Sequence, residues 1–157
     1  MKGRNLKKKP RISKEITLQD YLYHVEITLI NRNVDLHKYK RIQDHITFTY
    51  LFPHRNDRRC RCGCGRSIEP PKICWATRQC NYKATMTYLF LRGDNSTVRK
   101  MLKERDHQVC AVCGEVSIEW DADHILPVRE GGGGTVDLSN LQTLCKKCHK
   151  EKHKRKI

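Results

Sequence analysis

The sequence predicts an α+β protein in which bound metal supplements a small hydrophobic core. At 157 residues the chain has room for one domain or two small ones, and each would have a thin core. Its nine cysteines fall in close groups, which favours metal thiolates over disulfides, and an odd number cannot pair completely. A helical pattern near the N-terminus is followed by short alternating stretches, which indicates both helices and strands.

The charge of the chain indicates a polyanionic partner. Lys and Arg number 32 against 17 Asp and Glu, a formal net charge of +15. The excess is concentrated near the two ends, in "KGRNLKKKPR" and "KKCHKEKHKRKI". Nucleic acid is the partner that this distribution favours, and two solvated basic tails without a specific partner are the alternative.

A membrane protein or a secreted protein is not expected. No apolar stretch approaches the roughly 18 residues that a membrane helix requires, and no apolar region follows the basic start. The basic runs also lack an apolar helix face with which to lie on a membrane. We therefore expect a cytoplasmic or nuclear protein, in which reduced thiols stay available for metal.

Residues 1–55 are predicted to form a basic arm and a small α/β region. Residues 1–12 contain little that could be buried. Apolar residues recur at helical spacing in "TLQDYLYHVEITLI", residues 17–30, whereas "ITFTYLF", residues 46–52, alternates like a strand. The sequence indicates no function for this region, and its histidines, His24, His37 and His45, lack the spacing of metal ligands.

Residues 56–82 have the composition of a small zinc finger. Cysteines occur at 60, 62, 64, 74 and 80, with little apolar material to hold the segment together. Five cysteines compete for four ligand positions. We expect Cys62, Cys64 and Cys80 to be ligands, with either Cys60 or Cys74 as the fourth, and reduced structural thiols are the alternative.

Residues 83–108 are predicted to be a helical connector. Asp94 to Ser96 can cap a short helix, and Val98, Met101 and Leu102 form a narrow apolar stripe on it. The other faces of this helix carry basic side chains. Two of them, Arg99 and Lys103, are candidate DNA contacts, and a solvated helix face is the alternative.

Residues 109–157 contain the strongest signal, two pairs of cysteines with two residues between the members of each pair. "CAVCG" supplies Cys110 and Cys113, and "CKKC" supplies Cys145 and Cys148. Four thiolates complete the tetrahedral coordination of Zn²⁺ and leave no open position. We therefore expect a structural zinc ion that contributes folding free energy and no chemistry.

Asp123 and His124 lie between the two cysteine pairs and are not needed for that zinc. A carboxylate is a hard oxygen ligand for a divalent cation, and an imidazole can take a proton from water at neutral pH. Downstream, Asn140 lies in "DLSNLQTLC" and His149 follows the last cysteine. On a helix that starts there, His153 lies one turn further on the same side.

The run "CAVCG…DADHILPV…GGGG…DLSNLQTLCKKCHKEKH" resembles the motif of HNH endonucleases on their ββα-metal fold. The resemblance covers residues 110–153, and the three letters of the motif fall on His124, Asn140 and His149. The segment is also similar to the HNH domain of some DNA-remodelling enzymes, which would make branched DNA a substrate.

The resemblance implies a role for each of these residues. Asp123 and His149 would hold a catalytic Mg²⁺ or Mn²⁺, His124 would be the general base, and Asn140 would brace the loop between the strands and orient His124. The reaction would be hydrolysis of DNA, with RNA left open as a substrate. One such unit cuts one strand per visit, so double-strand cleavage requires a dimer or a second visit.

Each residue also has a plainer interpretation. Asp123 and His124 could be a surface pair, Asn140 a turn residue and His149 a zinc ligand. We expect His153 to contact phosphate or to be a bystander rather than to bind metal, and Lys150 is a further candidate DNA contact. The alternative function for the whole chain is a non-catalytic zinc-containing protein that binds nucleic acid through its charge.

Overall fold

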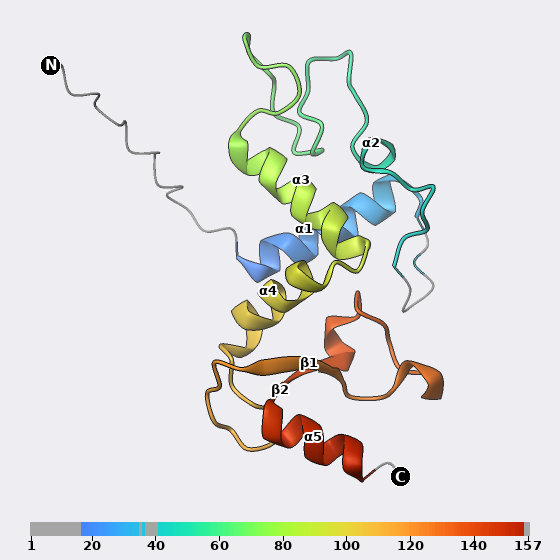
Figure 1. Cartoon of the computed structure of the whole chain (residues 1–157). Coiled ribbons are helices and arrows are strands. Elements are labelled where there is room, and N and C mark those ends of the chain that lie inside the picture. The colour runs from blue at the N-terminus through green and yellow to red at the C-terminus, as the bar shows by residue number, and fades with distance from the viewer. Residues whose placement is uncertain (1–16, 35, 37–40, 156–157) are drawn as a thin grey trace, which may run out of the picture.

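The computed structural model describes residues 17–34, 36 and 41–155, and Figure 1 shows how its elements are arranged. The predicted basic arm, residues 1–12, and His37 lie outside the described residues. The described helices and strands are α1 (Leu18–Asn31), α2 (Phe48–Leu51), α3 (Arg78–Leu91), α4 (Asn95–Asp106), β1 (Trp120–His124), η1 (Val128–Glu130), η2 (Leu138–Asn140), β2 (Leu141–Cys145) and α5 (Lys146–Lys154). Within the described residues no helix is both long and apolar enough to cross a membrane.

The first predicted helix is confirmed as α1. Thr17 accepts a hydrogen bond from the Asp20 backbone N–H, and the Asp20 carboxylate accepts one from the Thr17 backbone N–H. This capping box satisfies backbone donors that the first turn of a helix leaves free. The helix buries Tyr21, His24 and Val25, which share one face because they lie three and four residues apart.

The prediction of a strand at residues 46–52 is wrong, because this segment forms the one-turn helix α2. The Thr47 side chain caps it by accepting a hydrogen bond from the Tyr50 backbone N–H at 3.1 Å. Phe48, Leu51 and Phe52 all pack against the core. Their spacing of three and four residues suits a helix face, whereas a short apolar run by itself does not distinguish helix from strand.

The predicted connector contains two helices, α3 and α4, that meet at a tight turn. Gly93, in this turn, has φ of +73°, a conformation that favours glycine. The predicted cap of the second helix is confirmed, since Asp94 is the N-cap of α4 and Val98, Met101 and Leu102 are buried. Helix α3 begins at Arg78, so it starts inside the segment predicted as a finger.

One hydrophobic core joins the N-terminal helices to the C-terminal sheet. The cluster of buried side chains extends from Tyr21 in α1 to Leu141 in β2. Trp120 of β1 belongs to it, and the Arg99 guanidinium of α4 lies 4.0 Å from the Trp120 ring centre. Arg99 also donates to the Trp120 carbonyl at 2.8 Å. The sheet is therefore held on α4 by apolar packing, a cation–π contact and a hydrogen bond.

Strands β1 and β2 are antiparallel, with Asp123 opposite Gln142 and His124 opposite Leu141. Alternate residues of a strand point to opposite faces. Trp120 and Ala122 pack against the core, so Asp121 and Asp123 point the other way, toward α5. In Figure 1, α5 lies at the end of the molecule away from α1 and α3, with the sheet between.

Replacing Asp94 with alanine should destabilise the protein through α4. The Asp94 carboxylate accepts hydrogen bonds from the Ser96 hydroxyl and from the Thr97 backbone N–H and hydroxyl, and losing such a cap costs about 1–2 kcal/mol. These bonds, from Ser96 first and then Thr97, lower the pKa of Asp94. Its contribution is therefore present above the usual carboxyl pKa of about 4 and is lost as pH falls through the lower folded value.

Urea unfolding at neutral pH and at low pH measures this effect. The difference in unfolding free energy between wild type and Asp94→Ala should shrink at low pH. Lys103→Ala, an exposed change on the same helix, is the control. A difference that stays constant with pH would contradict the cap.

Candidate metal centres and active site

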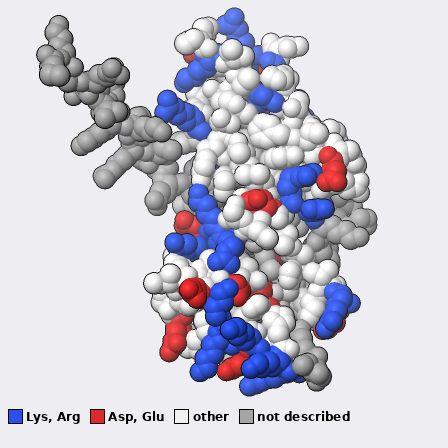
Figure 2. Space-filling model, in the orientation of Figure 1, with Lys and Arg blue, Asp and Glu red and all other residues white. Residues whose placement is uncertain are grey.

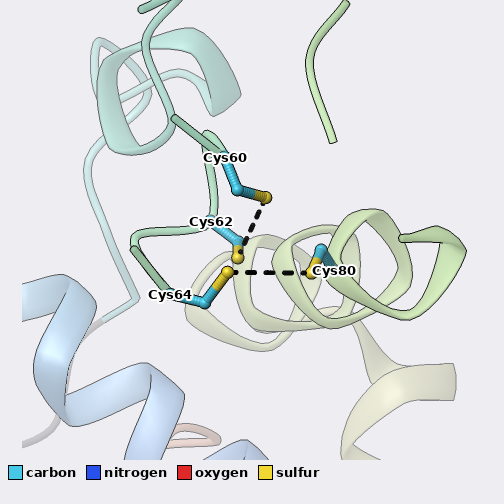
Figure 3. Close-up of side chains that lie close together, drawn as sticks. All are labelled: Cys60, Cys62, Cys64 and Cys80. Carbon is cyan, nitrogen blue, oxygen red and sulfur yellow. Dashed lines mark hydrogen bonds between the residues drawn. The ribbon is translucent and has the colours of Figure 1, made fainter. Parts of the chain in front are cut away.

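The first group of cysteines brings four sulfur atoms together where the loop before α3 meets that helix (Figure 3). All four lie within 4.8 Å of one another; they belong to Cys60, Cys62, Cys64 and Cys80. The Cys64 and Cys80 sulfurs are 3.9 Å apart and the Cys60 and Cys62 sulfurs 3.3 Å apart. Thiolates on a tetrahedral Zn²⁺ lie about 3.8 Å from each other, so this group could hold zinc.

The geometry selects Cys60, not Cys74, as the fourth member of this group. The Cys74 sulfur lies outside the cluster, 4.0 Å from His54 Nδ1 and 3.9 Å from Arg61 Nη1. The Cys60 sulfur accepts a hydrogen bond from the Ala76 backbone N–H at 3.3 Å. Burial raises the pKa of the Cys60 thiol, and this backbone donor partly offsets the rise because it stabilises thiolate sulfur.

His24 supports the cluster from α1 without being one of its members. One ring nitrogen lies 3.0 Å from the Cys62 carbonyl oxygen and the other 2.8 Å from the Thr87 hydroxyl. Burial lowers the pKa of His24 more than the Cys62 carbonyl raises it. The histidine is therefore a neutral core residue that ties α1 to the cysteine loop and to α3.

The second group of cysteines matches the strongest prediction from the sequence. Its four sulfur atoms also lie within 4.8 Å of one another and belong to Cys110, Cys113, Cys145 and Cys148. Burial of Cys110 opposes its ionisation, but backbone N–H groups, first that of Cys113, outweigh burial and lower the pKa of the thiol to about 6. This thiol is ready to lose its proton, as zinc binding requires. Cys145 is also the N-cap of α5, so this cluster lies at the start of the helix that carries His149.

A third cluster of potential ligands lies where β1 faces α5. Asp123 Oδ1 is 3.8 Å from His149 Nε2 and 3.4 Å from His153 Nε2, and the two histidine nitrogens are 3.1 Å apart. Asp123 is buried, with 6% of its surface exposed. The structure therefore places His153 beside Asp123 and His149, in a position where it could be a third metal ligand. The sequence favoured a phosphate contact for this residue.

Three polar side chains around this cluster were missed by the sequence reasoning. Asp121 Oδ2 is 3.1 Å from His149 Nδ1, which leaves His149 Nε2 facing the cluster. Gln142 donates to Asp123 Oδ2 at 2.9 Å, and the Lys152 ammonium contacts the same oxygen. The alternation along β1 could have indicated Asp121, because it lies two residues before Asp123 on the same face.

The charge state of Asp123 follows from these contacts. Burial alone would raise the pKa of its carboxyl, but the hydrogen bonds from Lys152 and Gln142 and the nearby positive charges lower it further than burial raises it. The carboxylate is therefore ionised at neutral pH. Its Oδ2 is occupied by Lys152 and Gln142, whereas Oδ1 faces the two histidines.

His124 ends β1, and Asn140 holds the loop that follows it. The Asn140 side chain accepts a hydrogen bond from the Leu126 backbone N–H at 2.9 Å and donates to the carbonyls of Leu126 and Gly133 at 2.9 and 2.8 Å. A Cβ atom at Gly132 would lie 2.8 Å from the Asn140 amide nitrogen and 1.9 Å from the Leu126 carbonyl oxygen. Close packing therefore requires glycine there.

The candidate DNA contacts fall into two groups. The Arg99 guanidinium is occupied by Trp120, as described above, whereas Lys103 and Lys150 are exposed. On the face drawn in Figure 2, Lys and Arg gather most densely over α5, whose sequence KKCHKEKHK contains five lysines. A surface of this charge attracts a polyanion.

A family model for the HNH endonuclease domain matches residues 110–155. This match contains both the second cysteine cluster and the cluster of Asp123, His149 and His153. The C-terminal part of the chain is therefore an HNH endonuclease domain.

Curated relatives match parts of the chain. Anaredoxin from Nostoc sp. is 34% identical, over 39% of this chain and 78% of that protein. The DNA annealing helicase and endonuclease ZRANB3 of Homo sapiens is 29% identical over 50% of this chain, and that of Bos taurus is 28% identical over 57%. The chain spans only 11% and 12% of the length of these two proteins. No solved structure matches the chain significantly.

Zinc content tests the assignment of the first cysteine cluster. Purified protein should contain two zinc ions per chain, and Cys60→Ser should lose one of them because a closed site needs four protein ligands. Cys74→Ser is the matched control and should keep both. Elemental analysis after gel filtration measures the ratio. Equal zinc loss in both variants would contradict the choice of Cys60.

Proposed function

We propose that the protein is a metal-dependent endonuclease that hydrolyses DNA phosphodiester bonds and cuts one strand per active site. The observation that carries this proposal is the cluster of Asp123, His149 and His153 in the segment that matches the HNH model. His124 follows Asp123 directly and ends β1. A cation ligand and a proton acceptor are therefore consecutive residues at the end of one strand, on its two faces.

The ligand atoms of this cluster fit a small divalent cation. Ligands bound at about 2.1 Å to one cation lie about 3 to 4 Å from each other, and the three separations of 3.1, 3.4 and 3.8 Å agree with this. One carboxylate oxygen and two imidazole nitrogens suit Mn²⁺ and, with added water, Mg²⁺. When bound, the cation would stabilise negative charge on the scissile phosphate and on the leaving 3′ oxygen.

The side chains of the protein supply the remaining parts of the reaction. His124 accepts the proton of the attacking water, because a neutral imidazole carries one nitrogen that can take up a proton. Asn140 positions His124 indirectly, because its three hydrogen bonds hold the backbone that follows the histidine. Lys152 keeps Asp123 ionised and also donates to the His124 carbonyl at 2.5 Å, which ties the end of β1 to α5.

DNA is the substrate that the other observations favour. The net charge of +15 and the lysines of α5 provide non-specific attraction to phosphates. The mammalian relatives are named as enzymes that anneal DNA and cut nucleic acid, which supports the same substrate class. The two cysteine clusters act as structural zinc sites, because each has four protein ligands and no open position.

Plasmid nicking tests the proposed reaction. With Mg²⁺ or Mn²⁺ the wild type should convert supercoiled plasmid to open circles, and excess EDTA should stop it. His124→Ala should slow cleavage by about 10²–10⁴-fold, because a positioned general base contributes that much. His45→Ala, which removes an exposed histidine outside the site, is the control. Salt-sensitive DNA binding without cleavage under any metal would instead favour the non-catalytic zinc protein.

Metal affinity tests the role proposed for Asp121. Asp121→Asn should weaken Mn²⁺ binding by about 10- to 100-fold, because the carboxylate that orients a ligating histidine also increases its basicity. Glu151→Gln removes an exposed acid from α5 and should leave the affinity unchanged. Calorimetry on the zinc-loaded protein measures both. Equal Mn²⁺ affinity in the two variants would show that Asp121 does not support the site.

A further inference from the structure

A hollow of about 540 Å³ lies between the N-terminal part of the chain and the loop after β1. One side consists of residues 41–44, which precede the matched HNH segment. The other side consists of residues within that segment. The polar and charged side chains that line it include those of Arg41, Asp44, His124 and Thr135. Val128 and Gly134 also line it.

His124 is the reactive group in this hollow. The alternation of β1 turns its side chain away from α5 and toward the face on which Trp120 and Ala122 meet the N-terminal helices. Its Nε2 atom is buried and, among the described residues, is the one buried side-chain nitrogen or oxygen without a hydrogen-bond partner. A buried polar atom without a partner is costly and marks a place where a ligand or water is expected.

Arg41 lines the same hollow as this histidine, and the turn between α3 and α4 holds its backbone. Its neighbour Ile42 is buried, with 1% of its surface exposed, and donates its backbone N–H to the Leu91 carbonyl at 2.8 Å. Gly93 packs between Arg41 and Thr135: a Cβ atom there would lie 3.6 Å from Arg41 Cβ and 2.8 Å from Thr135 Oγ1. The backbone of Arg41 is therefore held close to Thr135, which lies in the loop between β1 and β2.

The charges in the hollow favour an anion. Asp44 is the acidic residue of its lining, and it pairs with Arg92 at 3.0 Å. Within the part of the chain that the structure describes, no carboxylate pairs with Arg41. The Arg41 guanidinium and the Thr135 hydroxyl thus offer donors to an anion, and the carboxylate of the lining is already paired with Arg92. A guanidinium suits a phosphate because its N–H groups can bind two phosphate oxygens at once.

We propose that Arg41 and His124 form a subsite for a DNA phosphodiester, in which Arg41 binds the phosphate that is attacked with the help of His124. This inference rests on the proposed nuclease function. It implies that the active site is shared: residues 110–155 supply the base and the cation ligands, and the N-terminal part supplies a phosphate-binding arginine. The shared hydrophobic core then has a catalytic consequence, since it sets the position of Arg41 relative to His124.

Cleavage by the full-length chain tests the subsite. Arg41→Ala should lower kcat/KM by about 10- to 100-fold, the range expected for a charge-assisted hydrogen bond. Arg41→Lys should recover part of this loss, because it keeps the charge but not the paired donors. Arg129→Ala removes an exposed arginine of η1 that does not line the hollow, and it should change kcat/KM by less than about two-fold. Circular dichroism verifies that all variants fold.

A second measurement separates this inference from the proposed function. In EDTA, a short DNA duplex should shift the imidazole NMR resonances of His124 in the wild type and shift them much less in Arg41→Ala. A wild type that cuts DNA, with Arg41→Ala equal to Arg129→Ala in rate and in NMR shifts, overturns the subsite alone. A wild type that cuts nothing overturns the nuclease proposal, and the NMR comparison then decides whether Arg41 and His124 bind the phosphodiester.

Discussion

The two faces of strand β1 determine the arrangement of the candidate site. Trp120 and Ala122 are anchored in the core on one face, and burial of a large aromatic side chain gives this orientation a strong energetic preference. Slippage of the strand by one residue would turn every side chain to the opposite face. The apolar packing on one side therefore keeps Asp121 and Asp123 next to α5 on the other, although neither carboxylate takes part in that packing.

The cysteine clusters add a second constraint, in places where apolar side chains are few. The second hydrophobic cluster consists of little more than Cys110, Leu144 and Cys148, which is too little to hold a loop and a helix by burial alone. Sulfur atoms gathered at the start of α5 set the position of its first turn, and His149 lies in that turn. Folding of this end and placement of the histidine thus depend on the same group of thiols.

Local patterns in the sequence predicted the features that depend on residues close together in the chain. The buried face of helix α1 and the Asp94 cap involve residues three or four positions apart, and each pair of cysteines has two residues between its members. Chain geometry therefore limits the structures that these segments can form. Residues 46–52 were assigned to the wrong element because their apolar residues fit both periods, and packing of Phe48, Leu51 and Phe52 on the core selects the helix. The choice between Cys60 and Cys74 also depends on a tertiary contact, since the Cys80 sulfur meets only the former in the cluster.

The sequence by itself determined the chemical groups at the C-terminal end: two pairs of thiols, an adjacent carboxylate and imidazole, an asparagine and a histidine after the last cysteine. These follow from residue identity and spacing, which the chain carries before it folds. Tertiary structure alone decided which groups meet. Segments distant in sequence meet in three places: His153 and Lys152 approach Asp123, Asp121 contacts His149, and Arg41 lines the same hollow as His124. Their proximity results from the shared core, because apolar periodicity shows which face of an element is buried but not which segment packs against it.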